Sequence, residues 1–316
     1  MRILFTGASS FTGFWFVREL SLAGHSVVAT FRKKLDSYEG VRRERVRLLA
    51  EHCEPAVGCG FGSGEFLELI RGCKDWDVLC HHAADVSDYK SSDFDVVAAL
   101  SNNTRNVSQV LKALRERGCR RVVLTGSIFE QGEGVGSGGL PAFSPYGMSK
   151  GLTADVFRYH AEAERVRLGK FVIPNPFGPY EEPRFTAYLM RTWLDGKVAL
   201  VNTPAYVRDN IHSSLLARCY VKFLESLPAD PGFSTHHPSG YVETQGAFAQ
   251  HFAAEMRTRF DMPCELDLKH QVEFAEPGVR INMEPAAQFV SNWDETAAWD
   301  EVAGYYREMA DVGSTC

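Results

Sequence analysis

Two side chains with complementary acid–base chemistry stand four residues apart in the segment Tyr146-Gly147-Met148-Ser149-Lys150. If this segment begins a helix, Tyr146 and Lys150 lie on one face, one turn apart. A lysine ammonium beside a phenol favours the phenolate and lowers the tyrosine pKa from about 10 toward the working range. Tyr146 could then exchange a proton with a substrate hydroxyl while a hydride passes to or from a nicotinamide, with Lys150 holding the nicotinamide ribose. A surface pair without a role is the alternative.

A serine supplies the third candidate catalytic group. Ser127 ends the predicted strand that contains Val122-Val123-Leu124-Thr125. Its hydroxyl could bond to the reacting oxygen and stabilise the charge that develops there. A serine after a strand is by itself usually a turn residue, so this assignment depends on Tyr146 and Lys150.

A glycine turn follows the first predicted strand and reads Thr6-Gly7-Ala8-Ser9-Ser10-Phe11-Thr12-Gly13. Gly7 would allow the tight turn, and Gly13 would let the next helix pack close to the strand. Backbone N–H groups of Ser9, Ser10, Phe11 and Thr12 would then face a pyrophosphate at the helix start. Ser10 replaces the middle glycine of the usual spacing, so a purely structural turn is the alternative.

The end of the second predicted strand bears on the choice of cofactor. It carries Arg32-Lys33-Lys34, with no acidic residue before Asp36. NAD-binding folds usually place an acid there for the ribose hydroxyls, whereas cations suit a 2′-phosphate. The pattern favours NADP(H), leaves NAD(H) possible, and has a solvated basic loop as its alternative.

Short β-rich runs alternate with helical stretches through the first half of the chain, which predicts an α/β fold with a doubly wound, Rossmann-type parallel sheet. The expected strands are 2–6, 26–31, 76–82, 121–125 and 170–173, and the clearest helix is 93–117, with an apolar stripe from Val97 to Leu114. Gly24, Gly118, Gly169 and Gly196 are expected to end helices, and Gly132 to Gly139 to form a mobile loop near the active site.

The pattern loosens after Pro174, which predicts a smaller C-terminal substrate-binding domain. We assign residues 1–174 to the cofactor domain, rejoined by about 205–226, and residues 175–204 and 227–316 to the second domain.

Composition limits the class of partner. The 316 residues are 45% apolar and 23% charged, with a formal net charge of -6. Because the net charge is spread over both halves of the chain and no long apolar span is present, nucleic acid and membrane are not expected as partners. Eight scattered cysteines without a CxxC pair, and no visible signal peptide, favour a cytoplasmic protein.

His81 and His82 should point to opposite faces of a strand, and no metal motif is present.

These segments together resemble the extended short-chain dehydrogenase/reductase superfamily, in particular its nucleotide-sugar epimerases, dehydratases and 4-ketoreductases. The resemblance covers nearly the whole chain. It implies that Ala83 and Ala84, after the strand beginning at Asp77, contact the cofactor. It also implies that Asn175, in Asn175-Pro176-Phe177-Gly178-Pro179, and Arg208, in Arg208-Asp209-Asn210-Ile211-His212, bind the diphosphate of a nucleotide sugar.

Departures from the family pattern separate the possible reactions. Dehydratases carry Asp-Glu after the catalytic serine or threonine, but Ile128 and Phe129 stand there. An adenine-contacting Asp is missing around Gly60-Phe61-Gly62, and Ser213-Ser214 replaces an acidic pair. With Arg32, the sequence favours NADPH-dependent reduction of a keto sugar. The alternatives are an NAD-dependent 4-epimerase, a reductase of a non-sugar carbonyl, and a cofactor-sensing regulator, which usually lacks the Tyr/Lys pair.

The resemblance also implies an assembly. In this superfamily the helix after the fourth strand and the Tyr146 helix pair with their copies in a two-fold interface. The apolar stripe from Val97 to Leu114 therefore predicts a homodimer, with burial inside one chain as the alternative.

Overall fold

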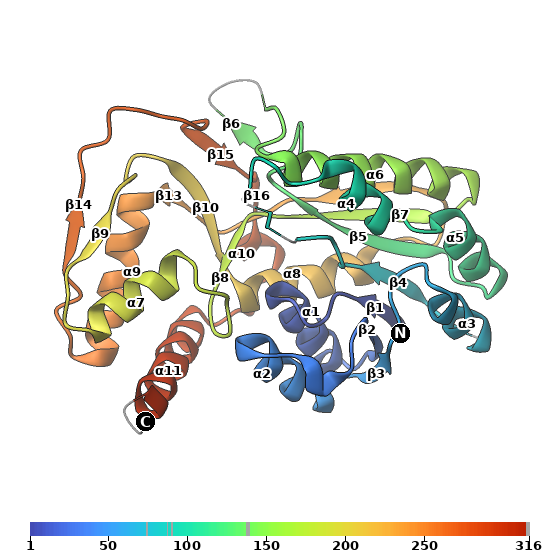
Figure 1. Ribbon diagram of the computed structural model, residues 1–316, viewed down its shortest axis with the longest axis horizontal. Coiled ribbons are helices and arrows are strands. Elements are labelled where there is room, and N and C mark those ends of the chain that lie inside the picture. The colour runs from blue at the N-terminus through green and yellow to red at the C-terminus, as the bar shows by residue number, and fades with distance from the viewer. Residues whose placement is uncertain (74, 87, 90, 137–139, 314–316) are drawn as a thin grey trace. The chain divides into compact units, whose positions relative to one another are not determined.

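The computed structural model of the chain describes residues 1–73, 75–86, 88–89, 91–136 and 140–313 (Figure 1). It contains two compact units. Unit 1 comprises Met1–Glu133, Leu140–Ile173 and Ala217–His237, and unit 2 comprises Gly134–Gly139, Pro174–Leu216 and Pro238–Cys316. The segment of unit 1 that follows Pro174–Leu216 is Ala217–His237, which overlaps residues 205–226 and includes strand β11 of the unit 1 sheet.

Unit 1 is built on a seven-stranded sheet in the order β11-β7-β5-β4-β1-β2-β3. All neighbouring strands are parallel. This is the strand order of a doubly wound Rossmann-type fold, and it confirms the predicted fold class. The order reverses between β1 and β4, the kind of point where such sheets bind ligands. The strands are β1 (Arg2–Thr6), β2 (Ser26–Phe31), β3 (Glu54–Val57), β4 (Val78–His81), β5 (Arg121–Ser127), β7 (Arg167–Ile173) and β11 (Gly232–His236).

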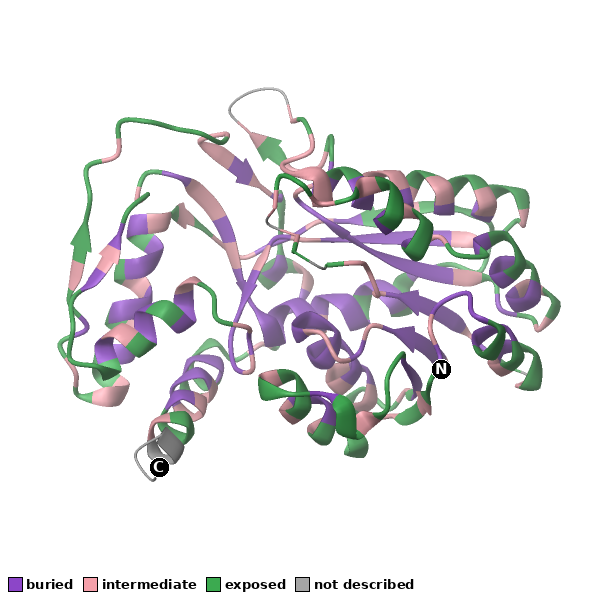
Figure 2. Ribbon diagram, viewed as in Figure 1, coloured by how far each residue is buried: buried purple, intermediate pink, exposed green. Residues whose placement is uncertain are grey.

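Helices pack on both faces of this sheet. One face meets α3, α5 and α6 through a cluster of buried apolar side chains that includes Phe66, Leu111 and Phe157. The other face meets α1 and α8, where the rings of Phe16 and Tyr220 stack with centroids 4.1 Å apart. Figure 2 shows the central strands as buried along most of their length. The helices are α1 (Phe11–Leu22), α2 (Gly40–Leu48), α3 (Gly64–Gly72), α4 (Val96–Asn103), α5 (Val107–Glu116), α6 (Pro145–Ala163) and α8 (Ser213–Ser226), which begins in unit 2, with 3₁₀ turns η1 (Leu35–Ser37) and η2 (Leu49–Glu51).

Of the three glycines expected to end helices in unit 1, two follow a helix and one lies in a strand. Gly24 after α1 and Gly118 after α5 have φ values of +83° and +86°, as expected. Gly169 was wrongly expected to end a helix, because it lies inside β7. A Cβ at Gly169 would lie 2.8 Å from Leu227 Cδ1, so the glycine makes room for packing. The left-handed residue after α6 is Arg165, with φ 54°.

The continuous helix predicted from Asp93 to Arg117 is wrong, because α4 and α5 are separate helices. Asn106 interrupts them with a left-handed backbone, φ 51°. Its side-chain amide donates to Gly62 O at 2.8 Å, after β3. A Cβ on Gly62 would lie 1.9 Å from Arg105 O, so the interruption fits closely against this glycine.

The expected apolar stripe divides at the same interruption. Val107, Leu111 and Leu114 on α5 are buried in the core, whereas Val97 on α4 is 76% exposed. The stripe is therefore not one face of one helix, and most of it is used inside unit 1.

Unit 2 contains a five-stranded sheet in the order β13-β10-β15-β6, with β8 also pairing with β10. Its core includes Phe177, Trp193, Phe252 and Trp299. Helix α7 is followed by Gly196 at φ +69°, as predicted. The elements are β6 (Val135–Gly136), β8 (Asn175–Phe177), β9 (Ala199–Val201), β10 (Val207–His212), β12 (Pro238–Ser239), β13 (Tyr241–Thr244), β14 (Leu266–Leu268), β15 (Val279–Ile281), β16 (Glu284–Pro285), α7 (Phe185–Leu194), α9 (Gln245–Phe260), α10 (Ala286–Phe289) and α11 (Glu295–Gly313).

The glycine-rich segment 132–139 is only partly a loop. Strand β6 within it pairs antiparallel with β15, and residues 137–139 lie outside the described residues. Within the described part of the chain, no helix is long and apolar enough to span a bilayer.

Replacing Asn106 distinguishes one continuous helix from two separate helices, because the expected change in the free energy of unfolding has the opposite sign in each case. Asn106→Ala loses the bond to Gly62 O and places alanine in a left-handed conformation, so the free energy of unfolding should fall by about 1–3 kcal/mol. In a continuous helix alanine would instead stabilise the protein. The control is Asn102→Ala on α4, which loses only a solvent-exposed bond to Asp85 Oδ2 at 3.0 Å, and a change within about 0.5 kcal/mol is expected. Thermal and denaturant unfolding measure both.

Candidate active site

The phosphate turn has the close contacts that its two glycines imply. Gly7 has φ +84°, and a Cβ there would lie 2.7 Å from Ala83 N. A Cβ on Gly13 would lie 2.2 Å from Gly7 O. Side chains at either position would push α1 away from β1 and β4, so the glycines hold the helix start close to the sheet.

Ser10, which replaces the middle glycine, is the N-cap of α1. Its hydroxyl donates to Gly7 O at 2.9 Å and accepts from Gly13 N at 3.2 Å. The N–H groups of Phe11 and Thr12 belong to the first turn and have no intrahelical acceptor. With the positive end of the helix dipole they suit a phosphate. Arg45 is buried and donates to Ser9 O at 3.1 Å, which fixes the outer side of the turn.

His82 connects this turn to the neighbouring strands. Its Nε2 lies 2.9 Å from Ser10 Oγ and 3.1 Å from Thr12 Oγ1, and its Nδ1 lies 2.9 Å from Thr125 Oγ1. Because the Ser10 hydroxyl donates to Gly7 O, it accepts from His82 Nε2–H, and Thr125 then donates to Nδ1. Burial lowers the pKa of His82 to about 3, which keeps this bridge neutral.

The predicted opposite orientation of His81 and His82 is confirmed by their partners. His81 stacks on Phe157 of α6 at 5.0 Å, whereas His82 packs against Phe16 of α1 at 5.3 Å. Ala83, which follows, donates its N–H to Thr6 Oγ1 at 3.1 Å, so the Ala83-Ala84 segment is held beside the end of β1.

The basic run after β2 is exposed to solvent. Arg32, Lys33 and Lys34 are all exposed, and the Arg32 side chain passes Gly60, whose Cβ would lie 3.4 Å from Arg32 Cγ. The loop therefore offers cations and no carboxylate where an adenosine ribose binds in this fold.

The three candidate catalytic residues come from two adjacent elements of unit 1. Ser127 is the last residue of β5, and Tyr146 and Lys150 lie in the first turns of α6. The helix begins at Pro145 with Ser144 as N-cap. A proline at the first helical position and a serine cap are a strong start signal, so the sequence itself places Tyr146 at the start of the helix.

Helix α6 touches the segment that follows Ser127. A Cβ on Gly147 would lie 2.1 Å from Phe129 O, and the same carbonyl accepts from Phe143 N at 2.9 Å. Tyr146 precedes Gly147 and is half-buried, with its ring against Tyr89 and Phe94 at 5.6 and 6.1 Å. The close approach therefore fixes the backbone of Tyr146 beside the segment that carries Ser127.

Lys150 extends from α6 to the sheet. Its Nζ donates to Thr125 O at 2.5 Å, two residues before Ser127, and the side chain is buried. Burial lowers the pKa of Lys150, Glu130 opposes this shift, and Lys170 adds to it. The strand end therefore holds a lysine whose proton is less tightly bound than in water.

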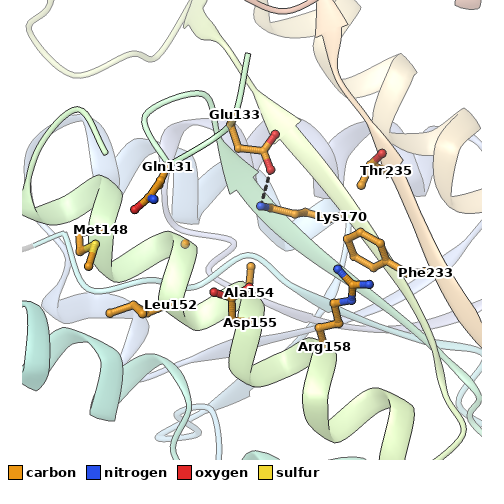
Figure 3. Close-up of a pocket in the computed structure, with 11 residues that line it drawn as sticks. Gln131, Glu133, Met148, Leu152, Ala154, Asp155, Arg158, Lys170, Phe233 and Thr235 are labelled. Carbon is orange, nitrogen blue, oxygen red and sulfur yellow. Dashed lines mark hydrogen bonds and ion pairs between the residues drawn. The ribbon is translucent and has the colours of Figure 1, made fainter. Parts of the chain in front are cut away.

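Reasoning from the sequence missed a charged network behind Ser127. Glu130 accepts a hydrogen bond from Ser127 N–H and forms an ion pair with Lys170. Lys170 also pairs with Glu133, which in turn meets His237. Lys170 and Glu133 line a pocket of about 380 Å³ between α6 and β11 (Figure 3). The available signal was Lys170 itself, because a lysine beside Phe171-Val172-Ile173 in a buried strand needs a partner.

Unit 2 holds the two residues expected at a diphosphate. Asn175 on β8 pairs in register with Asn210 on β10, the strand that also carries Arg208. Arg208 is half-buried and already engaged, with Nη2 2.7 Å from Glu276 and its guanidinium over the Tyr206 ring at 4.4 Å. A separate pocket of about 310 Å³ in this unit is lined by Phe185, Tyr188, Leu200, Val201, Asn202, Thr203 and Gln245.

The strand order, the glycine turn and the Ser-Tyr-Lys group define an extended short-chain dehydrogenase/reductase. A family model described as "NAD dependent epimerase/dehydratase family" matches residues 3–233, and the chain belongs to this family.

Solved structures with the same fold include UDP-sugar epimerases. The chain is similar to the UDP-glucuronic acid 4-epimerase of Bacillus cereus in complex with UDP-glucuronic acid and NAD, with 16% identity, a TM-score of 0.72, and coverage of 98% of this chain and 100% of the other. It is also similar to the UDP-glucose 4-epimerase of Bifidobacterium longum in complex with NAD+ and UDP, with 16% identity, a TM-score of 0.71, and 98% coverage of both.

A curated relative by sequence is cinnamoyl-CoA reductase 1 of Oryza sativa subsp. japonica, 33% identical over 133 residues. The match covers 39% of this chain and only a third of that relative's length, 33%.

The close approach of α6 to Phe129 can be tested with two glycines of the same helix. Gly147→Ala places a methyl group against a backbone oxygen, and overpacking of this kind should lower the free energy of unfolding by about 1–3 kcal/mol. Gly151→Ala is the control, because the nearest atoms to its Cβ lie at 3.9 Å. There alanine should stabilise the helix by about 0.5–1 kcal/mol. Equal shifts in melting temperature would contradict the contact.

Proposed function

We propose that this chain is an NAD-dependent epimerase of a nucleotide-activated sugar, with Ser127, Tyr146 and Lys150 as its catalytic residues. The observation that carries the proposal is the fixed approach of the α6 start to the end of β5, with Lys150 Nζ on Thr125 O at 2.5 Å. The family and the fold of UDP-sugar 4-epimerases support it. They favour epimerisation over the NADPH-dependent ketoreduction that the basic run after β2 suggested.

The chemistry required of the protein is proton transfer at a sugar hydroxyl. The bound nicotinamide supplies reversible hydride acceptance and return. Tyr146 takes the hydroxyl proton as the carbon is oxidised and gives it back when the carbon is reduced from the other face. Ser127 donates a hydrogen bond to the same oxygen, and Lys150 supplies the positive charge that favours the Tyr146 phenolate.

We assign the two ligands to different units. Unit 1 takes the dinucleotide, with Gly7 and Gly13 shaping the turn and the Phe11 and Thr12 amides on the pyrophosphate. Unit 2 takes the nucleotide sugar. Asn175 and Arg208 meet its diphosphate, and the phosphate then competes with Glu276 for Arg208. The pocket beside Phe185 and Tyr188 offers aromatic walls and the amides of Asn202 and Gln245, which suit a flat base.

NADPH-dependent reduction of a keto sugar is the second candidate. Arg32 favours it, because a guanidinium binds a 2′-phosphate with paired hydrogen bonds, and a charged bond of this kind contributes about 1.5–3 kcal/mol. The 33% identity over 133 residues to a protein named as a reductase also supports this candidate. In the epimerase, Arg32 instead lies beside the adenosine hydroxyls.

The two candidates differ in whether the cofactor is consumed. Incubation of the protein with NAD and UDP-glucose or UDP-glucuronic acid should convert each sugar to its C4 epimer, seen by NMR, without net accumulation of NADH. Tyr146→Phe should cut the rate by about 10²–10⁴-fold with NAD binding intact. Tyr159→Phe, on the exposed surface of the same helix, is the control and should match wild type. Stoichiometric NADPH oxidation with a keto sugar, and no epimer, would establish the reductase instead.

We also propose a homodimer formed through α4 and α6. Apolar side chains remain exposed on both helices, with Val97 at 76% and Met148 at 40%. A two-fold pairing of these helices would cover them. Sedimentation velocity at micromolar concentration should give twice the mass of 35.2 kDa. Val97→Asp should shift the protein toward monomer, and a monomeric wild type would contradict the proposal.

A further inference from the structure

Glu130 and Lys170 form an ion pair inside unit 1. Glu130 Oε2 lies 2.6 Å from Lys170 Nζ, and their side chains are only 1% and 9% exposed. Charges removed from water lose more hydration than their attraction usually returns, and apolar residues of similar size often stabilise such a position equally well. Stability alone therefore does not explain this pair.

The other oxygen of the same carboxylate binds the segment of the proposed catalytic serine. Glu130 Oε1 accepts the Ser127 N–H at 2.7 Å, and Glu130 N donates to Ser127 O at 3.0 Å. The two bonds close a tight turn at the end of β5. Ser127 Oγ accepts from Phe129 N at 3.2 Å in the same turn, so the orientation of the hydroxyl depends on the turn's geometry.

A glycine next to Ser127 accommodates the pair. A Cβ on Gly126 would lie 2.8 Å from Lys170 Cε and 3.2 Å from Glu130 Oε1. Any side chain at position 126 would therefore press on both members of the pair. The close contact shows that the carboxylate and the lysine are packed directly beneath the strand residue before Ser127.

Lys170 is held in turn by a second carboxylate. Its Nζ lies 2.6 Å from Glu133 Oε1, and Glu133 Oε2 lies 2.8 Å from His237 Nε2. Figure 3 shows Glu133 and Lys170 pointing toward one another across the pocket. Glu133 binds Lys170 as closely as Glu130 does, but the bonds described for it go to Lys170 and His237, whereas those of Glu130 reach Ser127.

We propose that Glu130 is a positioning residue for Ser127: it fixes the serine backbone at the end of β5, and Lys170 fixes the direction of the Glu130 carboxylate. This inference rests on the proposed function, because it assumes that the Ser127 hydroxyl meets the substrate. Misplacement of a catalytic group by about 1 Å can cost about 100-fold in rate, so the effect belongs in kcat.

The test compares two glutamate variants of similar chemistry. In Glu130→Gln the side chain has a single oxygen to accept from two donors, Ser127 N–H and Lys170 Nζ. Its NH2 group must therefore face one of them, and two donors then oppose each other. The kcat for epimerisation should fall by about 10- to 100-fold, with KM and NAD affinity within about two-fold. Glu133→Gln removes the other carboxylate charge from Lys170 without touching Ser127, and its amide can still accept from Lys170 and donate to His237 Nε2, so its kcat should stay within about two-fold of wild type. Equal losses in both variants would overturn the proposal.

A double variant separates positioning from charge and from folding. In Glu130→Gln/Lys170→Met the opposing donor is gone, so the oxygen of the introduced amide can accept from Ser127 N–H again. Turnover should recover to within about three-fold of wild type. A double variant that folds but remains as slow as Glu130→Gln would show that the carboxylate charge matters and would overturn the positioning role.

An NMR measurement without substrate tests the contact between Glu130 and Ser127 separately from the proposed function. In amide NMR spectra the Ser127 proton, bonded to a carboxylate, should move upfield in Glu130→Gln and stay in place in Glu133→Gln. An unmoved Ser127 signal in both variants would refute the contact. Absence of epimerisation by wild type, with the Ser127 shift as expected, would instead refute the proposed function and leave the contact established.

Discussion

The close approach of Gly147 to the Phe129 carbonyl determines much of the candidate active site. A side chain at position 147 would hold the start of α6 away from this carbonyl. Here backbone lies against backbone, with room for no Cβ between them, and the Phe143 amide binds the same oxygen. This contact sets Tyr146 beside the Ser127 segment, and Lys150 on the same helix reaches Thr125 O. The positions of all three candidate catalytic residues follow from this contact.

Charge at the end of β5 is distributed over several buried groups. Burial lowers the pKa of Lys150, and the neighbouring Lys170 cation lowers it further. Glu130 acts in the opposite direction on both lysines, because its negative charge favours their protonated forms. Without Glu130, the buried Lys150 would lose its proton more readily. Glu130, three residues after Ser127, therefore helps to keep Lys150 protonated.

Local signals were enough for the turn, the strands around it and the start of α6, because each is encoded in adjacent residues. β1 and β2 have the bounds that their apolar runs predict, and Pro145 marks the helix start. The interruption at Asn106 was missed because its cause is distant: Gly62 lies 44 residues earlier. Gly169 was misplaced for the same reason, since only the fold brings Leu227 against it. The Glu130 network likewise joins residues whose proximity no sequence spacing reveals, and a binding preference between NAD and NADP cannot be read from Arg32 alone.

The bridge through His82 has a consequence for how such a chain can change over evolution. Ser10 and His82 are separated by 72 positions but share one hydrogen bond. A descendant with glycine at position 10 would leave the imidazole Nε2 with Thr12 as its remaining neighbour in the turn. A descendant that replaced the histidine would leave the Thr125 hydroxyl to find another acceptor. The two sites therefore constrain one another, and substitutions at one should be accompanied by substitutions at the other among related sequences.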